Sequence, residues 1–300
     1  MKLGFRRIAV LLAVLALVAA SCGEDTPPVD GNDGQTDETV CATYDKDAGD
    51  LLAKICTDGE IRVSTDPAYP PQSELNPETG EYEGFDIDVA KEIADRLGVE
   101  LAWETPDWEV LTAGSWNDRW DMSVGSMTPI NERQEVLNFT EPYSYVPAVA
   151  VVPEDSNVTD VTTDLDGKRI GVCADCTYQF FLEKSLEIKG FEFDFVIDDA
   201  TVVGVDTDTT ALQDLTLGRL DAVITSSPTA VAFAAENPVK IVGDPLFGEP
   251  LAIAFDKSSE LDGTSLLETV DGMVADMHSD GTLTELSKKW YDGIDVTTVD

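Results

Sequence analysis

The chain has 300 residues, of which 43% are hydrophobic, so it can bury a sizeable core and form roughly one to three domains. Its formal net charge is -40 at pH 7, with 19 Lys and Arg residues against 59 Asp and Glu residues. This acidity excludes nucleic acid as a partner, because phosphate binding requires clustered basic side chains.

The N-terminus is predicted to be a targeting segment over residues 1–21, outside the folded protein. A positively charged start precedes an apolar run over residues 8–20, which is too short for a stable membrane span. Small residues follow directly before Cys22, which resembles a bacterial lipoprotein signal in which the cysteine is lipidated after cleavage. The lipid would be the protein's membrane attachment; ordinary cleavage with an unmodified Cys22 is the alternative.

Residues 22–50 read as a flexible acidic tether. Acidic residues alternate there with prolines and glycines, and little apolar surface is present to offset the cost of ordering the backbone. A tether behind a lipid anchor would let a folded domain reach across the cell envelope.

Four cysteines remain beside Cys22, and proximity in the chain favours pairing Cys41 with Cys56 and Cys173 with Cys176. Four cysteines allow three pairings, and the sequence alone does not choose among them. A zinc site is disfavoured by the single histidine, so no metal is expected. The Cys-X-X-Cys spacing also occurs in thioredoxin-like redox sites, but the surrounding thioredoxin pattern is missing.

Predicted strands and helices alternate along the rest of the chain. In chain order they are strand 61–64, helix 86–97, strand 101–103, helix 109–118, strand 122–125, strand 168–173, helix 177–189, strand 193–197, helix 211–218, strand 221–225, helix 266–277 and helix 283–290. This alternation predicts an α/β fold with mostly parallel sheets.

Four loops after predicted strands hold the candidate site. They are residues 65–72, 105–108, 125–133 and 174–177. In open α/β sheets the ligand binds beyond the carboxyl ends of the strands, so these loops should converge. They supply aromatic rings, hydroxyls, backbone N–H groups and one arginine, which together suit a small zwitterion.

Several motifs give the chain a specific resemblance over residues 59–290. They are Asp66-Pro67-Ala68-Tyr69-Pro70-Pro71, Gly84-Phe85-Asp86-Ile87-Asp88, Gly125-Ser126-Met127-Thr128 with Arg133, Phe139-Thr140-Glu141-Pro142-Tyr143, Gly218-Arg219-Leu220-Asp221-Ala222-Val223, and Asp280-Gly281-Thr282 through Lys289-Trp290. In this order and spacing the chain resembles a family 3 extracellular solute-binding protein, the polar amino-acid-binding component of ABC importers.

The resemblance implies a periplasmic-binding-protein fold, in which two α/β lobes are joined by two crossing strands near residues 144–150 and 244–252. Lobe 1 would comprise residues 51–146 and 247–300, and lobe 2 residues 147–246. The lobes would close on the ligand by a hinge motion.

The resemblance also implies roles for individual residues. Arg133 would bind the ligand carboxylate, helped by Thr128, Thr177, the backbone near Cys176, and Gly125 with Ser126. Tyr69 and Trp108 would enclose the ligand side chain. Asp66 would contact the α-ammonium or another polar end of the ligand; capping of the Pro-rich turn is the alternative. Thr177 could likewise be only a helix N-cap.

Three positions depart from the family pattern and bear on the ligand. Ser226 stands where an acid usually pairs with the α-ammonium. Asp175-Cys176-Thr177 replaces the usual Gly-Thr-Thr or Gly-Ser-Thr, and Gln72 replaces an aromatic ring. The ligand is therefore expected to be an amino acid or a related zwitterion, with its ammonium contact left open.

The function expected from the sequence is capture of this ligand outside the cytoplasm, either in the periplasm or on the outer face of the membrane, and delivery to an ABC-importer permease. We expect a monomer without a cofactor and without enzymatic activity. Two alternatives stay open: a cyclohexadienyl-dehydratase-like enzyme on the same fold, and a ligand-sensing subunit of a signalling partner.

Overall fold

The computed structural model describes residues 38–298. The predicted targeting segment, Cys22 and residues 22–37 of the predicted tether lie outside the described residues. Within residues 38–298, no helix is both long enough and apolar enough to cross a membrane.

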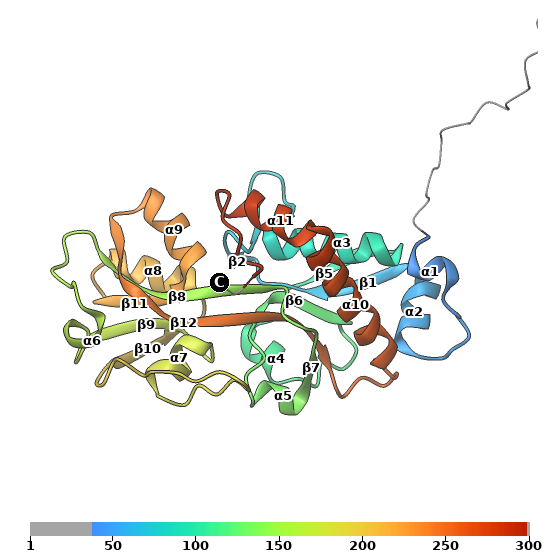
Figure 1. The fold of residues 1–300 in the computed structure, drawn as a ribbon, viewed down its shortest axis with the longest axis horizontal. Coiled ribbons are helices and arrows are strands. Elements are labelled where there is room, and N and C mark those ends of the chain that lie inside the picture. Colours follow the sequence, from blue (N-terminus) through green and yellow to red (C-terminus); the bar gives the residue numbers. More distant parts are fainter. Residues whose placement is uncertain (1–37, 299–300) are drawn as a thin grey trace, which may run out of the picture. The chain divides into compact units, whose positions relative to one another are not determined.

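A nine-stranded mixed sheet runs through the described part of the chain, with the strand order β10-β9-β11-β8-β12-β6-β1-β5 and β7 paired to β12 (Figure 1). The strands are β1 (Glu60–Ser64), β5 (Glu100–Glu104), β6 (Met122–Met127), β7 (Leu137–Phe139), β8 (Ser144–Pro153), β9 (Arg169–Cys173), β10 (Thr201–Val205), β11 (Ala222–Ser226) and β12 (Val239–Asp256). A small antiparallel sheet contains β2 (Ala68–Tyr69), β3 (Ser73–Leu75) and β4 (Tyr82–Glu83).

Two long antiparallel strands, β8 and β12, connect the two halves of this sheet. β12 pairs with β6 and β7 in one half, and β8 pairs with β11 in the other. We call these the β1 half, where β1 pairs in parallel with β5 and β6, and the β9 half, where β9 pairs in parallel with β10 and β11. β8 and β12 cover the two stretches in which crossing strands were expected.

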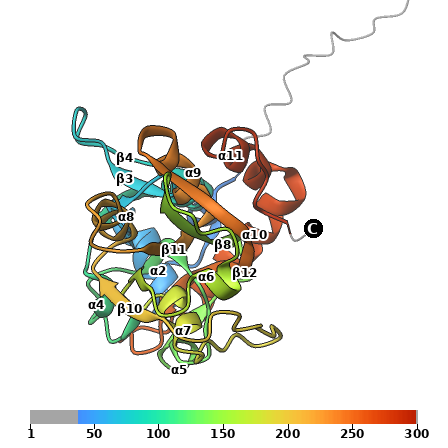
Figure 2. The same ribbon diagram turned by 90° about the vertical axis from the view of Figure 1, so that its left-hand side faces the viewer.

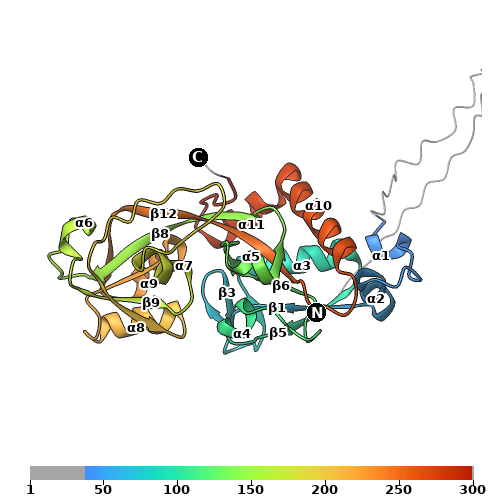
Figure 3. The same ribbon diagram turned by 90° about the horizontal axis from the view of Figure 1, so that it is seen from below.

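Helices cover both faces of each half of the sheet (Figures 1 and 3), and Figure 2 views the molecule from the β9 end. The helices are α1 (Val40–Thr43), α2 (Leu51–Asp58), α3 (Phe85–Leu97), α4 (Trp108–Thr112), α5 (Arg133–Val136), α6 (Val161–Asp164), α7 (Thr177–Leu182), α8 (Asp208–Thr216), α9 (Ser227–Glu236), α10 (Thr264–Asp280) and α11 (Thr282–Trp290). Separate hydrophobic clusters fill the two halves.

Helix α3 shows how the sequence pattern produces this packing. Its buried apolar side chains recur at helical spacing, with Ala90, Ile93 and Leu97 all 0% exposed against the core of the β1 half. Gly98 ends the helix in a left-handed conformation, φ 79°, which glycine adopts without a side-chain clash. The helix predicted over residues 86–97 is thereby confirmed.

The prediction of a strand over residues 193–197 was wrong. The segment carries apolar residues at alternate positions, but Phe193, Phe195 and Ile197 pack as a loop onto the core of the β9 half. The strand that pairs with β9 is β10, which follows in the chain. Tertiary packing of a loop reproduced the period expected of a strand.

Two predicted helices are shorter than expected. The helix predicted over 109–118 ends at Thr112, since Gly114 has φ 65° and Asp256 accepts hydrogen bonds from the N–H groups of Ser115 and Trp116. The helix predicted over 177–189 ends at Leu182, and Lys184 has a left-handed φ of 59°. Helices α1, α2, α5, α6 and α9 were not predicted.

The folded unit begins earlier than the predicted end of the tether at residue 50. Helix α1 lies inside that range, and its Cys41 is buried and joined to Cys56 of α2 by a disulfide. Both cysteines belong to the core of the β1 half. Residues 38–50 are therefore part of the folded protein.

Candidate ligand-binding site

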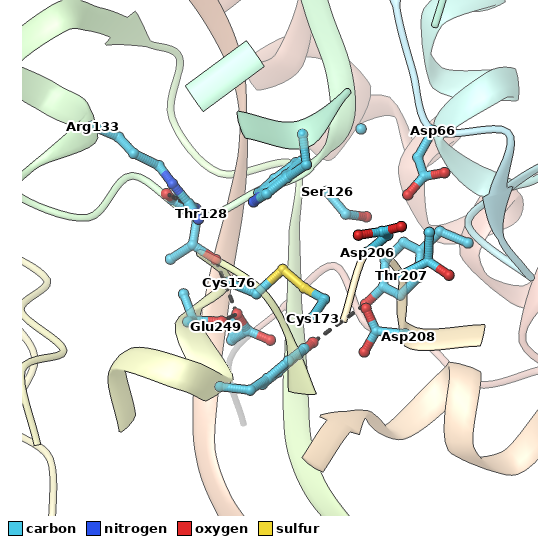
Figure 4. A pocket seen from close by; sticks show the side chains of 15 residues that line it. Asp66, Ser126, Thr128, Arg133, Cys173, Cys176, Asp206, Thr207, Asp208 and Glu249 are labelled. Atoms are coloured by element: carbon cyan, nitrogen blue, oxygen red, sulfur yellow. Dashed lines mark hydrogen bonds between the residues drawn. A yellow bond between two sulfur atoms is a disulfide. The ribbon is translucent and has the colours of Figure 1, made fainter. Parts of the chain in front are cut away.

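A pocket lies beyond the carboxyl ends of strands from both halves of the sheet (Figure 4). Loops after β1 and β6 reach it from the β1 half, and loops after β9 and β10 reach it from the β9 half. Its lining residues are Asp66, Tyr69, Trp108, Gly125, Ser126, Thr128, Arg133, Cys173, Cys176, Thr177, Tyr178, Asp206, Thr207, Asp208 and Glu249.

Arg133 is held rigidly on one side of this pocket. Its guanidinium lies over the Trp108 ring, 4.9 Å from the centroid, and donates to the backbone oxygens of Thr128 (3.0 Å) and Asp175 (2.7 Å). The Trp108 indole N–H also donates to the Asp175 oxygen, at 3.3 Å. Burial lowers the pKa of Arg133 to about 10, so the guanidinium stays charged at pH 7. The site can therefore present a fixed cation to a carboxylate.

Glu249 reaches the pocket from the connecting strand β12 and is 3% exposed. The hydroxyls of Thr128 and Thr177 both donate to its Oε2 atom. Its Oε1 atom has no hydrogen-bond partner among the described residues. Burial raises the pKa of Glu249, and the neighbouring hydroxyls oppose that shift. The two threonines predicted to bind the ligand carboxylate thus already serve a protein carboxyl group.

A group of acids lies on the opposite side of the pocket from Arg133, where Figure 4 shows Asp66, Asp206 and Asp208. Asp208 begins α8 and is 5% exposed, and its Oδ1 atom has no partner among the described residues. Burial raises its pKa to about 7; the Thr225 hydroxyl opposes that shift, and nearby Glu249 and Asp66 add to it. Asp66 Oδ1 accepts from the N–H of Ala68 at 2.8 Å, so this residue caps its turn as well as lining the pocket.

Aromatic rings and a disulfide also line the pocket. The Tyr69 and Tyr178 hydroxyls lie 3.3 Å apart and link β2 to α7. Cys173 ends β9 and is disulfide-bonded to Cys176, with a Cα–Cα distance of 5.5 Å. Cys176 is the N-cap of α7, so Thr177 is the first residue of the helix and not its cap.

A buried hydrogen-bond network fixes the strand end that lines the pocket. Asp86 accepts from the Ser126 and Tyr143 hydroxyls, both at 2.8 Å, and the Ser126 N–H donates to the Tyr143 oxygen. Ser126 is held in this way with a left-handed φ of 52°. Burial raises the pKa of Asp86 to about 7. Asp86 thus positions Ser126 from behind the pocket.

The structure brings nine of the ten predicted ligand-binding residues to the pocket; Ser226 is the exception. Ser226 is buried at the N-cap of α9, where its hydroxyl accepts from the Gln72 amide at 2.9 Å and donates to Thr229. Gln72 also accepts from the Thr229 hydroxyl at 3.1 Å. The two departures at positions 72 and 226 therefore satisfy each other.

Sequence reasoning missed six lining residues: Cys173, Tyr178, Asp206, Thr207, Asp208 and Glu249. Asp206 to Asp208 follow β10, so they would have been candidates had that strand been located correctly. Tyr178 follows the predicted Thr177 directly. Glu249 gave no local signal, because it reaches the site only through the path of β12.

One group of three possible metal ligands occurs among the described residues: Cys173, Cys176 and Asp208, with ligand atoms within 4.8 Å of one another. Both sulfur atoms belong to the disulfide. Metal ligation requires the thiolate form of cysteine, so the oxidised pair does not form a metal centre.

A pocket between two α/β halves that share two connecting strands defines a two-lobed binding protein. Residues 61–293 match the bacterial extracellular solute-binding proteins, family 3. The chain belongs to this family, as its motifs predicted.

Among curated relatives, the chain is 30% identical over 250 residues to the L-cystine-binding protein TcyJ of Escherichia coli (strain K12), covering 82% of this chain and 88% of that protein. It is 27% identical over 242 residues to the histidine-binding periplasmic protein of Salmonella typhimurium, covering 78% and 88%. These relatives are named as binding proteins, in agreement with the expectation that this chain is not an enzyme.

Solved structures confirm the expected periplasmic-binding-protein fold. The P235GK mutant of ArgBP from T. maritima has a TM-score of 0.69 and 31% identity, covering 80% of this chain and 99% of that one. The ancestral amino-acid-binding protein AncCDT-1, a precursor of cyclohexadienyl dehydratase, has a TM-score of 0.70 and 28% identity with the same coverage.

Proposed function

We propose that this protein captures an amino acid outside the cytoplasm and delivers it to the permease of an ABC importer. The observation that carries the proposal is the buried guanidinium of Arg133, which is fixed against Trp108 in a pocket that also offers carboxylates. A charged guanidinium facing carboxylates suits the two charged ends of an amino acid. Relatives of this chain are named for binding cystine, histidine and arginine, and these three ligands all carry the charged head group of an amino acid.

Ligand capture would proceed by closure of two lobes, with residues 51–146 and 247–300 in one and residues 147–246 in the other. Polar contacts across the pocket support this division. Asp175 accepts hydrogen bonds from Arg133 and Trp108, and the Thr209 hydroxyl donates to the Ala68 oxygen at 2.8 Å. Hydrogen bonds of this kind exchange with water at modest cost, so they can break and re-form as a hinge opens.

Membrane attachment would depend on a lipid at Cys22. The sequence before Cys22 supports this part of the proposal, and fractionation tests it. The wild-type protein should follow the membrane fraction, and Cys22→Ala should move it to the soluble fraction without changing ligand affinity.

A thermal-shift screen against the common amino acids tests the binding function, since a ligand that binds only the folded state raises the melting temperature. At least one amino acid should stabilise the wild type, and Arg133→Ala should abolish that stabilisation. Arg119→Ala is a matched control, because Arg119 also lies over a tryptophan, 4.7 Å from the Trp120 ring, but outside the pocket. If no amino acid stabilises the protein, the proposal fails; turnover of prephenate would favour the dehydratase alternative.

A further inference from the structure

The pocket is lined by more acidic side chains than an amino acid with a neutral side chain would pair with. Four of its 15 lining residues bear carboxyl groups, and Arg133 is the single basic residue among them. A zwitterion adds no net charge, so binding one would leave this imbalance in place. Carboxylates that are buried without counter-charges are costly, and a ligand with an additional positive charge would offset that cost.

The acidity continues into an outer chamber of about 420 Å³, which shares Asp66, Trp108 and Asp206 with the pocket. Five of the 15 residues lining this chamber are acidic, and none is Lys, Arg or His. The added acids are Asp107, Glu109 and Asp175. The charged side chains that a cationic group would meet in this chamber are all carboxylates, whose combined field attracts it.

The acidity of the chain is not spread evenly over its hollows. A groove lined by 14 residues around β7 and the connecting strands contains Lys189 and Lys257 and no acid at all. Of the 300 residues in the chain, 59 are acidic. The groove has no acidic lining residue, whereas one in three of the residues that line the chamber is acidic. Two other hollows, each lined by eight residues, also contain three acids and no Lys, Arg or His, so it is the continuity of the chamber with the pocket, through Asp66, Trp108 and Asp206, that connects the chamber's acids to the site.

Asp208 has the properties of an ammonium acceptor. Its side chain is 5% exposed, it lines the pocket opposite Arg133, and its Oδ1 atom has no partner among the described residues. Ser226, the position at which the family resemblance predicted the ammonium contact, is bonded to Gln72 and Thr229 instead. Asp208 can provide the missing negative partner from the start of the neighbouring helix α8.

We infer that the ligand is a basic amino acid whose carboxylate binds Arg133, whose α-ammonium binds Asp208, and whose side-chain cation faces the acids of the outer chamber. This inference rests on the proposed function and adds the ligand class. A ligand with two amino-acid heads, such as cystine, is disfavoured, because its second carboxylate would lie among acids with no base nearby. A neutral side chain would leave the chamber charges without a partner.

Calorimetry with the purified protein and two ligands of nearly equal shape tests the ligand class. L-arginine should bind at least ~10-fold more tightly than L-citrulline, which replaces the guanidinium by a neutral urea group. Agmatine, which lacks the carboxylate, should bind more weakly than L-arginine by a similar factor or more. L-cystine should bind more weakly than L-arginine.

Variants separate the contributions of the two ends of the ligand. Asp208→Asn should weaken L-arginine and L-citrulline alike, by about 10- to 100-fold, because both carry the α-ammonium. Asp206→Asn should weaken L-arginine alone and so narrow the ratio between the two ligands. Asp244→Asn is the matched control, since Asp244 is exposed, removes the same charge and does not line the pocket. Melting curves establish that each variant is folded.

Each outcome decides one part of the inference. Equal affinity for L-arginine and L-citrulline, or tightest binding of L-cystine, overturns the ligand class while leaving amino-acid capture intact. Unchanged affinity in a folded Asp208→Asn protein overturns the ammonium contact. If no amino acid binds the wild type, the proposed function itself fails.

Discussion

The two sides of the pocket differ in how their charges are satisfied. On one side the Arg133 guanidinium stacks on Trp108 and donates to two backbone oxygens. On the other side Asp208 is buried with an oxygen that has no partner among the described residues. The first side is already ordered by the protein, whereas the second is completed only by a ligand that brings positive charge.

This difference implies that the two sides contribute differently to binding. The Arg133 side is preorganised, so its contribution should depend little on pH near neutrality. The Asp208 side must hold an ionised carboxyl in a buried position, so its contribution should depend on pH and on the charge of the ligand. Variants that remove the charge on one side at a time should therefore differ in the size and the pH dependence of their effects.

Removal of the preorganised cation should have the largest effect. Arg133→Ala deletes the proposed partner of the carboxylate and leaves Trp108 without its stacked guanidinium, so affinity for any amino-acid ligand should fall by about 100-fold or more. Calorimetry measures this loss directly. Retained affinity in Arg133→Ala, with Arg119→Ala as the control, would mean that the carboxylate binds elsewhere.

The acidic side should give binding a pH dependence. The pKa of Asp208 is raised to about 7, so its carboxyl group is largely protonated below that pH. Binding of an ammonium group to the ionised carboxylate then requires Asp208 to release its proton. Affinity for L-arginine should therefore rise by about 10-fold between pH 6 and pH 8 and then level off. In Asp208→Asn the rise should be smaller, and an unchanged pH profile in this variant would contradict the assignment. The wild type and the variant share the other titratable groups near this position, which are Tyr69, Tyr178, Glu249 and Asp66. A difference between the two pH profiles therefore reports on Asp208.

Stability of the unliganded protein should change with pH in the opposite direction. A carboxyl whose pKa is raised by folding favours the folded state while protonated, so stability should fall as pH rises through about 7. Both Asp208 and Asp86 contribute. Asp208→Asn should therefore reduce the loss of stability between pH 6 and pH 8, measured by urea unfolding, by about 1 kcal/mol. An identical loss in the variant would show that Asp208 does not carry the shift.

The Cys173–Cys176 disulfide should matter for affinity because it closes the loop that carries Asp175. The backbone oxygen of Asp175 accepts from Arg133 and Trp108, so a looser loop would weaken the ordered side of the pocket. A Cys173→Ser, Cys176→Ser double variant should bind about 3- to 10-fold more weakly, at a cost of roughly 1 kcal/mol.

The other disulfide is the control for that experiment. Cys41 and Cys56 are 15 residues apart in the core of the β1 half, so their loss should lower stability by about 3 kcal/mol. Ligand affinity should stay the same in the folded fraction. Equal effects of the two double variants on affinity would argue against a special role for the pocket disulfide.

The smallest effect is expected at the exposed acids of the outer chamber. Asp206→Asn should weaken L-arginine binding by about 2- to 5-fold at low salt, because a surface charge pair contributes ~1 kcal/mol or less. The difference from the wild type should shrink at 0.5 M salt through screening. A salt-independent loss would instead indicate a direct, buried contact with Asp206.

The local sequence pattern was sufficient to predict a pocket residue where its position depends on a single nearby strand. Arg133, Thr128 and Trp108 follow strands whose limits the hydrophobic pattern predicts well, and all three line the pocket. Asp208 was missed because the loop containing Phe193 and Phe195 reproduced the period of a strand, which moved the predicted strand away from β10.

The local sequence pattern could not predict the role of residues whose contacts come from distant parts of the chain. Glu249 meets Thr128 and Thr177 only because β12 runs between the two halves of the sheet. Ser226 does not line the pocket as predicted, and its hydroxyl accepts a hydrogen bond from Gln72, which is 154 positions away in the chain. Such pairings depend on topology, which neither composition nor periodicity contains.

A crystal structure of the protein with L-arginine tests the central claim most directly, because it locates both ends of the ligand at once. We predict the carboxylate within hydrogen-bond distance of the Arg133 guanidinium and the α-ammonium within hydrogen-bond distance of Asp208, with the side chain directed to the outer chamber. A ligand bound in the reverse direction, or with its α-ammonium away from Asp208, would contradict the account.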